Sequence, residues 1–386
     1  MDNNKYKKRH ALLSILALSL ATLFYNSADA AERRKERPLQ KVTLAYSSIS
    51  GTMGPVWVTY EAGFFRKHGL DVQLVFIKGG SKAVKALVSG DVDVAQVGGA
   101  GVLRSNLKGS DAVMIAGFLN TMNYEFIVDR NITRPEQLKG KAVAVSRFGG
   151  SSDFATRYAL DKFGLVPEKD VAILEIGTQS DRLAALQDGK VQGAMLSVPH
   201  TLQAKKLGFS TLVSLYTLGL DYQHTGLATT KALIVSQPEL LRRVMRAYVE
   251  GIHFYKTHRR EALAILQKYL KTDDIEALDE TYNVLALTLL PEKPYPTLRG
   301  IRIMLQRLAK KYPKAQTAKP ERFVDLTFVM ELDRSGFIDR LYKQTVATRE
   351  KQQPIPAPAR VKQKPTPAPV MAKGVPLPPS MPEPKP

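Results

Sequence analysis

The chain has 386 residues and a formal net charge of +20, with 56 Lys and Arg against 36 Asp and Glu. That length is enough for two domains of ordinary size, each with its own hydrophobic core. The absence of cysteine excludes zinc ribbons, thiol nucleophiles and a lipid-modified N-terminal cysteine. The basic residues are scattered and no nucleic-acid-binding signature occurs, so the charge indicates a basic surface and no nucleic-acid partner.

The N-terminal segment has the pattern of a secretory signal. A cluster of Lys and Arg between residues 5 and 9 precedes the apolar run Ala11 to Phe24, and Ala28-Asp29-Ala30 forms a small-x-small cleavage site. We predict a signal peptide over residues 1–30, a mobile N-terminus over 31–40, and no stable membrane insertion after cleavage. The alternative is that the segment is kept as a membrane anchor.

Strand-like and helix-like segments alternate from Lys41 onward. Lys41 to Tyr46 reads as a strand, residues 47–54 as a Gly- and Ser-rich turn, and Pro55 to Lys67 as a helix. The stretch from Asp71 to Gly109 then reads as strand, glycine turn, helix, strand, glycine turn and helix.

This stretch occurs a second time. Asp170 to Gly208 aligns with Asp71 to Gly109 without a gap, and the matched residues follow the same order of elements. The repeat predicts two similar α/β lobes with a central cleft between them.

The remaining segments predict how the chain connects the lobes. Strands are expected at Val113 to Phe118 and Tyr124 to Val128, with crossings between lobes at Val128 to Asn131 and Leu215 to Tyr222. Lobe 1 is then discontinuous, and the expected ranges are 41–128 for its first part, 129–217 for lobe 2 and 218–343 for the second, mainly helical part. Residues 344–386 are Pro-rich with few apolar side chains, which predicts a disordered tail.

Five Gly- and Ser-containing turns are the candidate binding elements. In open α/β sheets, ligands bind beyond the carboxyl ends of strands, where helix N-termini present free N–H groups. Glycine lets the backbone approach a ligand, and serine adds a hydroxyl group. Each turn has a simpler role as a helix cap. The candidate residues in these turns are Ser47, Ser48, Ser50, Gly51, Thr52, Gly79, Gly80, Ser81, Gly98, Gly99, Ala100, Gly149, Gly150, Ser151, Ser152, Ser197 and Pro199.

A few further residues lie beside these turns. Lys78 and Arg147 are placed to complete an anion site, since the positive ends of helix dipoles also favour an anion. Trp57, Phe118 and Asn120 lie near the predicted cleft, and His200 follows the last turn. Their simpler roles are core packing or a solvated surface. We find no catalytic motif, metal-binding cluster or cofactor motif, and expect no enzyme activity.

Three segments carry a resemblance to a known family. They are PVWVTYEAGFFRKHGLDV at Pro55 to Val72, GGSKAVKALVSGDVDVA at Gly79 to Ala95, and LKGKAVAV at Leu138 to Val145. In order and spacing the chain resembles the periplasmic substrate-binding proteins of nitrate/sulfonate/taurine-type ABC importers, which share their fold with yeast-type thiamine-pyrimidine synthases. The resemblance implies a bilobal type II binding-protein fold, a small-molecule ligand, an ABC transporter permease as partner, a monomer and a periplasmic location.

Two features depart from this resemblance. The pyrimidine synthases carry a cysteine-rich motif that this chain lacks, and the Pro-rich tail is not part of the family pattern. A secreted enzyme related to those synthases and an envelope scaffold acting through the tail remain the alternative hypotheses.

Overall fold

The computed structural model describes residues 38–218 and 221–343. The predicted signal peptide, residues 31–37 of the predicted mobile N-terminus and the Pro-rich tail lie outside these residues. Within the described ranges, no helix combines the length and the apolar character needed to cross a membrane.

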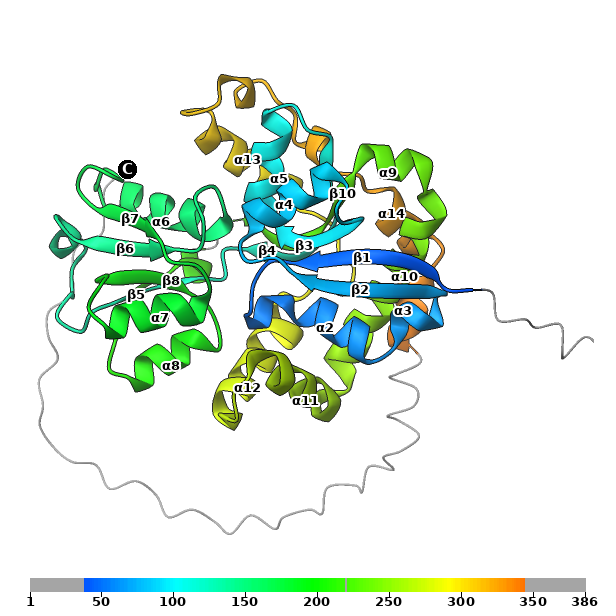
Figure 1. The fold of residues 1–386 in the computed structure, drawn as a ribbon, viewed down its shortest axis with the longest axis horizontal. Coiled ribbons are helices and arrows are strands. Elements are labelled where there is room, and N and C mark those ends of the chain that lie inside the picture. Colours follow the sequence, from blue (N-terminus) through cyan, green and yellow to red (C-terminus); the bar gives the residue numbers. More distant parts are fainter. Residues whose placement is uncertain (1–37, 219–220, 344–386) are drawn as a thin grey trace, which may run out of the picture. The chain divides into compact units, whose positions relative to one another are not determined.

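The first sheet has five strands in the order β2-β1-β3-β10-β4 (Figure 1). Strands β1, β2 and β3 are parallel, whereas β10 is antiparallel to both β3 and β4. The strand bounds are β1 (Gln40–Tyr46), β2 (Leu70–Phe76), β3 (Val94–Gly98), β4 (Ala112–Thr121) and β10 (Asp221–Thr230).

The second sheet repeats this plan in the order β7-β6-β8-β5-β9. Strands β6, β7 and β8 are parallel, and β5 is antiparallel to β8 and β9. The bounds are β5 (Glu125–Val128), β6 (Ala142–Val145), β7 (Ala172–Glu175), β8 (Gly193–Leu196) and β9 (Ser210–Ser214). The predicted repeat and the bilobal α/β fold are therefore confirmed.

The first crossing between lobes comes earlier than predicted. Strand β5 belongs to the second sheet, so the chain leaves the first sheet between Thr121 and Glu125 and not at Val128 to Asn131. The prediction was wrong because the apolar run of β5 does not say which sheet it pairs with. The second crossing falls between Ser214 and Asp221, within the predicted range. The other lobe limits stay predictions.

Helices cover both faces of each sheet, and the strand pattern explains how. Leu44 and Val94 face a core with α2 (Gly54–Glu61) and α10 (Pro238–Thr257), while the adjacent Ala45 and Ala95 face α4 (Gly80–Ser89) and α5 (Gly99–Leu107). Figure 1 shows these helix pairs on opposite faces. Because successive side chains in a strand point to opposite faces, one apolar strand serves two cores. In the second sheet, α6 (Ser151–Lys162) covers one face, with α7 (Gln179–Gln187) and α8 (His200–Lys206) on the other.

The predicted helices are present with shifted bounds. The helix expected from Pro55 to Lys67 is divided into α2 and α3 (Phe64–Lys67) at Gly63, whose φ of 76° favours glycine. The C-terminal part holds α9 (Lys231–Ser236), α11 (Arg259–Leu270), α12 (Ile275–Tyr282), a π-helix (Asn283–Leu289), α13 (Leu298–Leu308) and α14 (Thr327–Arg334). Residues 337–343 are also helical.

Strand β10 depends on a glycine at its centre, which gives the first prediction. A Cβ atom on Gly226 would lie 2.0 Å from the backbone oxygen of Ala116 on β4. We expect Gly226→Ala to lower the free energy of unfolding by about 1–3 kcal/mol, because the two strands must separate to fit the methyl group. Urea denaturation measures this change. In Gly80→Ala, where the nearest atom would be 4.0 Å away, stability should hold, and equal behaviour of the two variants would contradict the prediction.

Candidate functional site

A small cavity lies where residues at the strand ends of the two lobes meet. Its volume is about 50 Å³. The residues that line it come from both halves of the chain and are mostly polar: Ser47, Ser48, Ser50, Thr52, Met53, Lys78, Gly79, Gly80, Gly98, Tyr124, Ser146, Ser151, Gly177, Thr178, Gln179, Arg182, His224 and Thr225.

Four of the five predicted turns lie at or near this cavity, but only part of each lines it. The predicted residues that do so are Ser47, Ser48, Ser50, Thr52, Gly79, Gly80, Gly98 and Ser151. Ser48, Ser50 and Thr52 form a chain of hydroxyl groups, with oxygen separations of 3.2 Å and 2.8 Å. Both lobes therefore contribute hydroxyl or backbone groups to one cavity.

The predicted aromatic residues belong to the core. Trp57 is fully buried and stacks on Tyr269 with ring centroids 4.8 Å apart. Phe118 is also fully buried and stacks on Tyr248 at 5.1 Å. Neither side chain lines the cavity, because both belong to the core that packs between the first sheet and helices α2 and α10.

Several predicted polar residues are engaged elsewhere. The Ser152 hydroxyl accepts a hydrogen bond from the Ser146 amide at 2.9 Å, and Ser197 pairs with Gln179 through two hydrogen bonds. Arg147 pairs with Glu175, and the Asn120 amide donates to the Tyr295 carbonyl.

The remaining predicted residues also lie off the cavity lining. The Ser81 hydroxyl donates to the Phe148 carbonyl, and His200 bonds to Ser180. The other predicted residues outside the lining are Gly51, Gly99, Ala100, Gly149, Gly150 and Pro199.

The dominant charge of the cavity is Arg182 on α7. Its side chain is 2% exposed, and its Nε and Nη1 atoms have no hydrogen-bond partner among the described residues. Burial lowers the pKa of this guanidinium to about 10, so it still carries its proton at neutral pH. A buried cation without a paired anion is costly, and an anionic ligand would remove that cost.

The nearest carboxylate to Arg182 in sequence is already engaged. Asp181 closes the N-terminus of α7, since it accepts from the Thr178 amide at 2.9 Å while Thr178 caps the Asp181 amide. Asp181 also forms an ion pair with Lys78, which follows β2 in the other lobe. Partial burial acts to raise the pKa of Asp181, but the bonds from Lys78 and Thr178 outweigh it and hold the pKa below its usual value.

Helix N-termini add to the positive character of the cavity. The N-cap residues of α4, α5 and α6 are Gly79, Gly98 and Gly150, and none of them provides a side-chain cap. The first N–H groups of such helices favour an anion or another acceptor. Among the described residues, no group of His, Cys, Asp and Glu side chains is placed to hold a metal ion.

Arg182 and its neighbours were missed by sequence reasoning, although the repeat contained a signal. In the ungapped alignment Arg182 takes the position of Ala83, which is fully buried on α4. Thr178 and Gln179 likewise take the positions of Gly79 and Gly80. A charged residue at a core position of one copy marks the place where the two lobes differ in chemistry.

The comparison with family models covers more than half of the chain. Residues 51–262 match the model described as NMT1/THI5 like. The chain belongs to this family. Its relatives include YtlA of Bacillus subtilis, named as a binding protein, which is 24% identical over 75% of this chain and 90% of its own length. The riboflavin-binding protein RibY of Chloroflexus aurantiacus is 27% identical over 55% of this chain and 62% of its own length.

Further comparisons agree with this assignment. The taurine-binding periplasmic protein of Escherichia coli is 28% identical over 43% of this chain and 51% of its own length. The alkanesulfonate-binding protein SsuA of Xanthomonas axonopodis pv. citri, solved with bound MOPS, shares the fold with a TM-score of 0.61 and 15% identity, over 75% of this chain and 97% of that one. The relatives in sequence are named as binding proteins, which supports a solute-binding role for this member of the family.

Two buried histidines near Arg182 predict how stability depends on pH. Burial lowers the pKa of His224 to about 3, and burial together with the charge of Arg182 lowers that of His200 to about 4. In the unfolded chain both rings bind a proton below about pH 6.5, so the unfolded state binds more protons and stability falls as pH falls below that value. We expect a loss of about 1 kcal/mol per histidine at pH 5.5 relative to pH 7.5.

Urea denaturation at these two pH values tests the prediction. The double variant His200→Gln/His224→Gln should show a smaller loss than the unchanged protein. His68 and His253, whose pKa values burial also lowers, leave part of the pH dependence in place. A double variant with the same pH dependence as the unchanged protein would refute the assignment.

Proposed function

We propose that this protein captures a small organic anion in the cavity between its lobes and delivers it to the permease of an ABC importer. Arg182 supplies the charge that pairs with the anion. Hydrogen bonds to the anion come from the other walls of the cavity. They are supplied by the hydroxyl groups of Ser48, Ser50 and Thr52 and by the N-termini of α4 and α6.

The observation that carries the proposal is the unpaired burial of Arg182. Structural arginines in a protein interior are normally paired, because burying a charge alone is unfavourable. Here the guanidinium lines a cavity of polar groups and has two nitrogens without partners among the described residues. His224 and Thr225 also line the cavity, and His224 Nδ1 and Thr225 Oγ1 likewise have no hydrogen-bond partner among the described residues. A ligand with several acceptor oxygens satisfies all of these groups together.

The size of the cavity limits the ligand class. A volume of about 50 Å³ holds roughly four water molecules, each needing about 10–15 Å³ of this space. That is the size of a sulfonate, carboxylate or nitrate group with few further atoms. A ligand as large as riboflavin fits only if the lobes separate. The sulfonate named for SsuA and the taurine of the Escherichia coli protein fall in the favoured class.

The location follows from the same role. A binding protein of this kind acts outside the cytoplasmic membrane as an exported monomer, in agreement with the predicted signal at residues 1–30. The alternative of an enzyme related to thiamine-pyrimidine synthases predicts turnover of a bound pyrimidine, and the scaffold alternative predicts that loss of residues 353–386 abolishes function.

Substitution of the buried arginine tests the proposal. A thermal-shift screen of taurine, alkanesulfonates, nitrate, small carboxylates and riboflavin identifies a ligand, and calorimetry then measures its affinity. We expect Arg182→Met to weaken binding at least about 100-fold, because each lost hydrogen bond to a charged group contributes about 1.5–3 kcal/mol. The same variant should unfold at an equal or higher temperature, since an unpaired buried charge has been removed.

The matched control is Arg134→Met, which removes an exposed arginine from the same lobe. Its affinity and stability should equal those of the unchanged protein. An Arg182→Met protein that is folded and binds as tightly as the unchanged protein would disprove the proposal.

A second variant tests the place of the ligand without altering charge. Gly80 lines the cavity at the start of α4, where a leucine side chain would enter the space. We expect Gly80→Leu to abolish binding of the ligand found in the screen and to leave urea stability nearly unchanged, whereas Gly80→Ala should retain most of the affinity. Undiminished binding by Gly80→Leu would place the ligand outside this cavity.

A further inference from the structure

A second, much larger pocket lies on the other side of the first turn of α6. Its volume is about 400 Å³, within the range of pockets that hold small organic ligands. It shares no lining residue with the cavity around Arg182. The walls come from α5, α6, the turn before α6, the loop residues Pro167 and Glu168, and the segment from Arg307 to Tyr312 at the end of α13.

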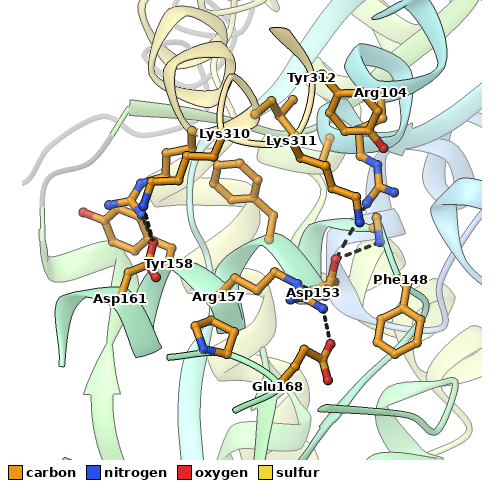
Figure 2. Close-up of a pocket in the computed structure, with 17 residues that line it drawn as sticks. Arg104, Phe148, Asp153, Arg157, Tyr158, Asp161, Glu168, Lys310, Lys311 and Tyr312 are labelled. Atoms are coloured by element: carbon orange, nitrogen blue, oxygen red, sulfur yellow. Dashed lines mark hydrogen bonds and ion pairs between the residues drawn. The ribbon is translucent and has the colours of Figure 1, made fainter. Parts of the chain in front are cut away.

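The walls of this pocket combine aromatic rings with guanidinium groups. Arg307 lies over the ring of Tyr158 at 4.3 Å, Arg104 over Tyr312 at 5.7 Å, and Arg157 over Phe148 at 5.9 Å. Figure 2 labels the three rings, together with Arg104 and Arg157, among the residues that line the pocket. Phe148 is 46% exposed although it is a large apolar side chain. Walls that combine aromatic rings with planar guanidinium groups favour a planar aromatic ligand, which can stack on either.

The charges around the pocket do not balance. Five cations (Arg104, Arg157, Arg307, Lys310 and Lys311) face three carboxylates (Asp153, Asp161 and Glu168).

The carboxylates are already paired with cations of the rim. Arg157 lies between two of them, at 2.7 Å from Asp153 and 2.6 Å from Glu168 (Figure 2). Arg307 pairs with the third, Asp161, at 2.7 Å. Arg104 and Lys310 reach a carboxylate only at 3.8 Å, and Lys311 forms no ion pair within the described part of the chain. The rim thus retains positive charge that an anion can neutralise.

Both lobes build this pocket. Arg104 and Arg307 belong to helices packed with the first sheet, whereas Asp153 and Asp161 lie on α6, one helical turn on either side of Arg157. The ion pairs Arg104–Asp153 and Arg307–Asp161 therefore join the two halves across the pocket.

We propose that this pocket is a second binding site, separate from the cavity around Arg182, for a planar aromatic acid. The aromatic part lies against Phe148, Tyr158 and Tyr312, and the acidic group lies near Arg104 and Lys311. This assignment does not depend on which anion occupies the smaller cavity.

The test uses 8-anilinonaphthalene-1-sulfonate, whose planar naphthalene ring carries the sulfonate and whose fluorescence increases on transfer to an apolar site. Full-length mature protein should bind it at one saturable site. We expect Lys311→Glu and Phe148→Ala each to weaken binding about tenfold, because the first replaces the unpaired positive charge with a negative one and the second removes an aromatic wall. N-phenyl-1-naphthylamine, which lacks the sulfonate, should bind the unchanged protein at least about tenfold more weakly.

Matched variants separate this pocket from the rest of the surface. Lys314→Glu introduces the same charge change at a nearby exposed residue outside the pocket, and should bind the probe like the unchanged protein. Arg182→Met should also bind it normally. The proposal would be overturned if Lys311→Glu and Phe148→Ala bound the probe as tightly as the unchanged protein does, or if Arg182→Met lost binding. It would also be overturned if the unchanged protein bound the uncharged probe as tightly as the sulfonate. Thermal unfolding verifies that each variant is folded.

Discussion

The arrangement of this molecule depends on two strands that complete the sheet of the opposite half. Strand β5 follows β4 of the first sheet but pairs with β8 and β9, and β10 follows β9 of the second sheet but pairs with β3 and β4. Because each of these strands pairs with the sheet of the other half, the chain crosses twice between the lobes. These crossings bring the ends of the strands of both sheets, and the helices that begin there, to the same cavity.

The cavity shows how two copies of one structural plan acquire different chemistry. In the first copy, small residues at the start of α4 leave backbone N–H groups accessible. In the second copy, Thr178 and Asp181 close the start of α7, and Arg182 occupies the buried position that Ala83 fills in α4. The first lobe thus contributes backbone and hydroxyl donors, and the second contributes a charge. Keeping that charge unpaired lowers stability, which is typical of a residue retained for binding.

The two hollows of the molecule differ in a way that separates their ligands. The cavity at Arg182 is small, polar and built around one buried charge, which is why we propose a compact anion as its ligand. The pocket between α6 and the end of α13 is about eight times larger by volume, with aromatic walls and several half-exposed cations. Because exposed charges are screened by water and salt, affinity in the larger pocket depends mainly on apolar contact, with charge adding selectivity.

The sequence by itself determined the elements, their order and the two-lobed repeat, because apolar periodicity and glycine turns are local properties. It also located turns such as Ser47 to Thr52 and Gly79-Gly80 at the cavity. Only the tertiary structure decided which sheet β5 joins, since an apolar strand carries no mark of its partner. It likewise placed Trp57 and Phe118 in the core and Arg182 at the cavity. Burial and pairing depend on contacts between residues that are distant in sequence. These contacts decide whether an arginine is a solvated surface group or, like Arg182, a buried charge without a partner among the described residues.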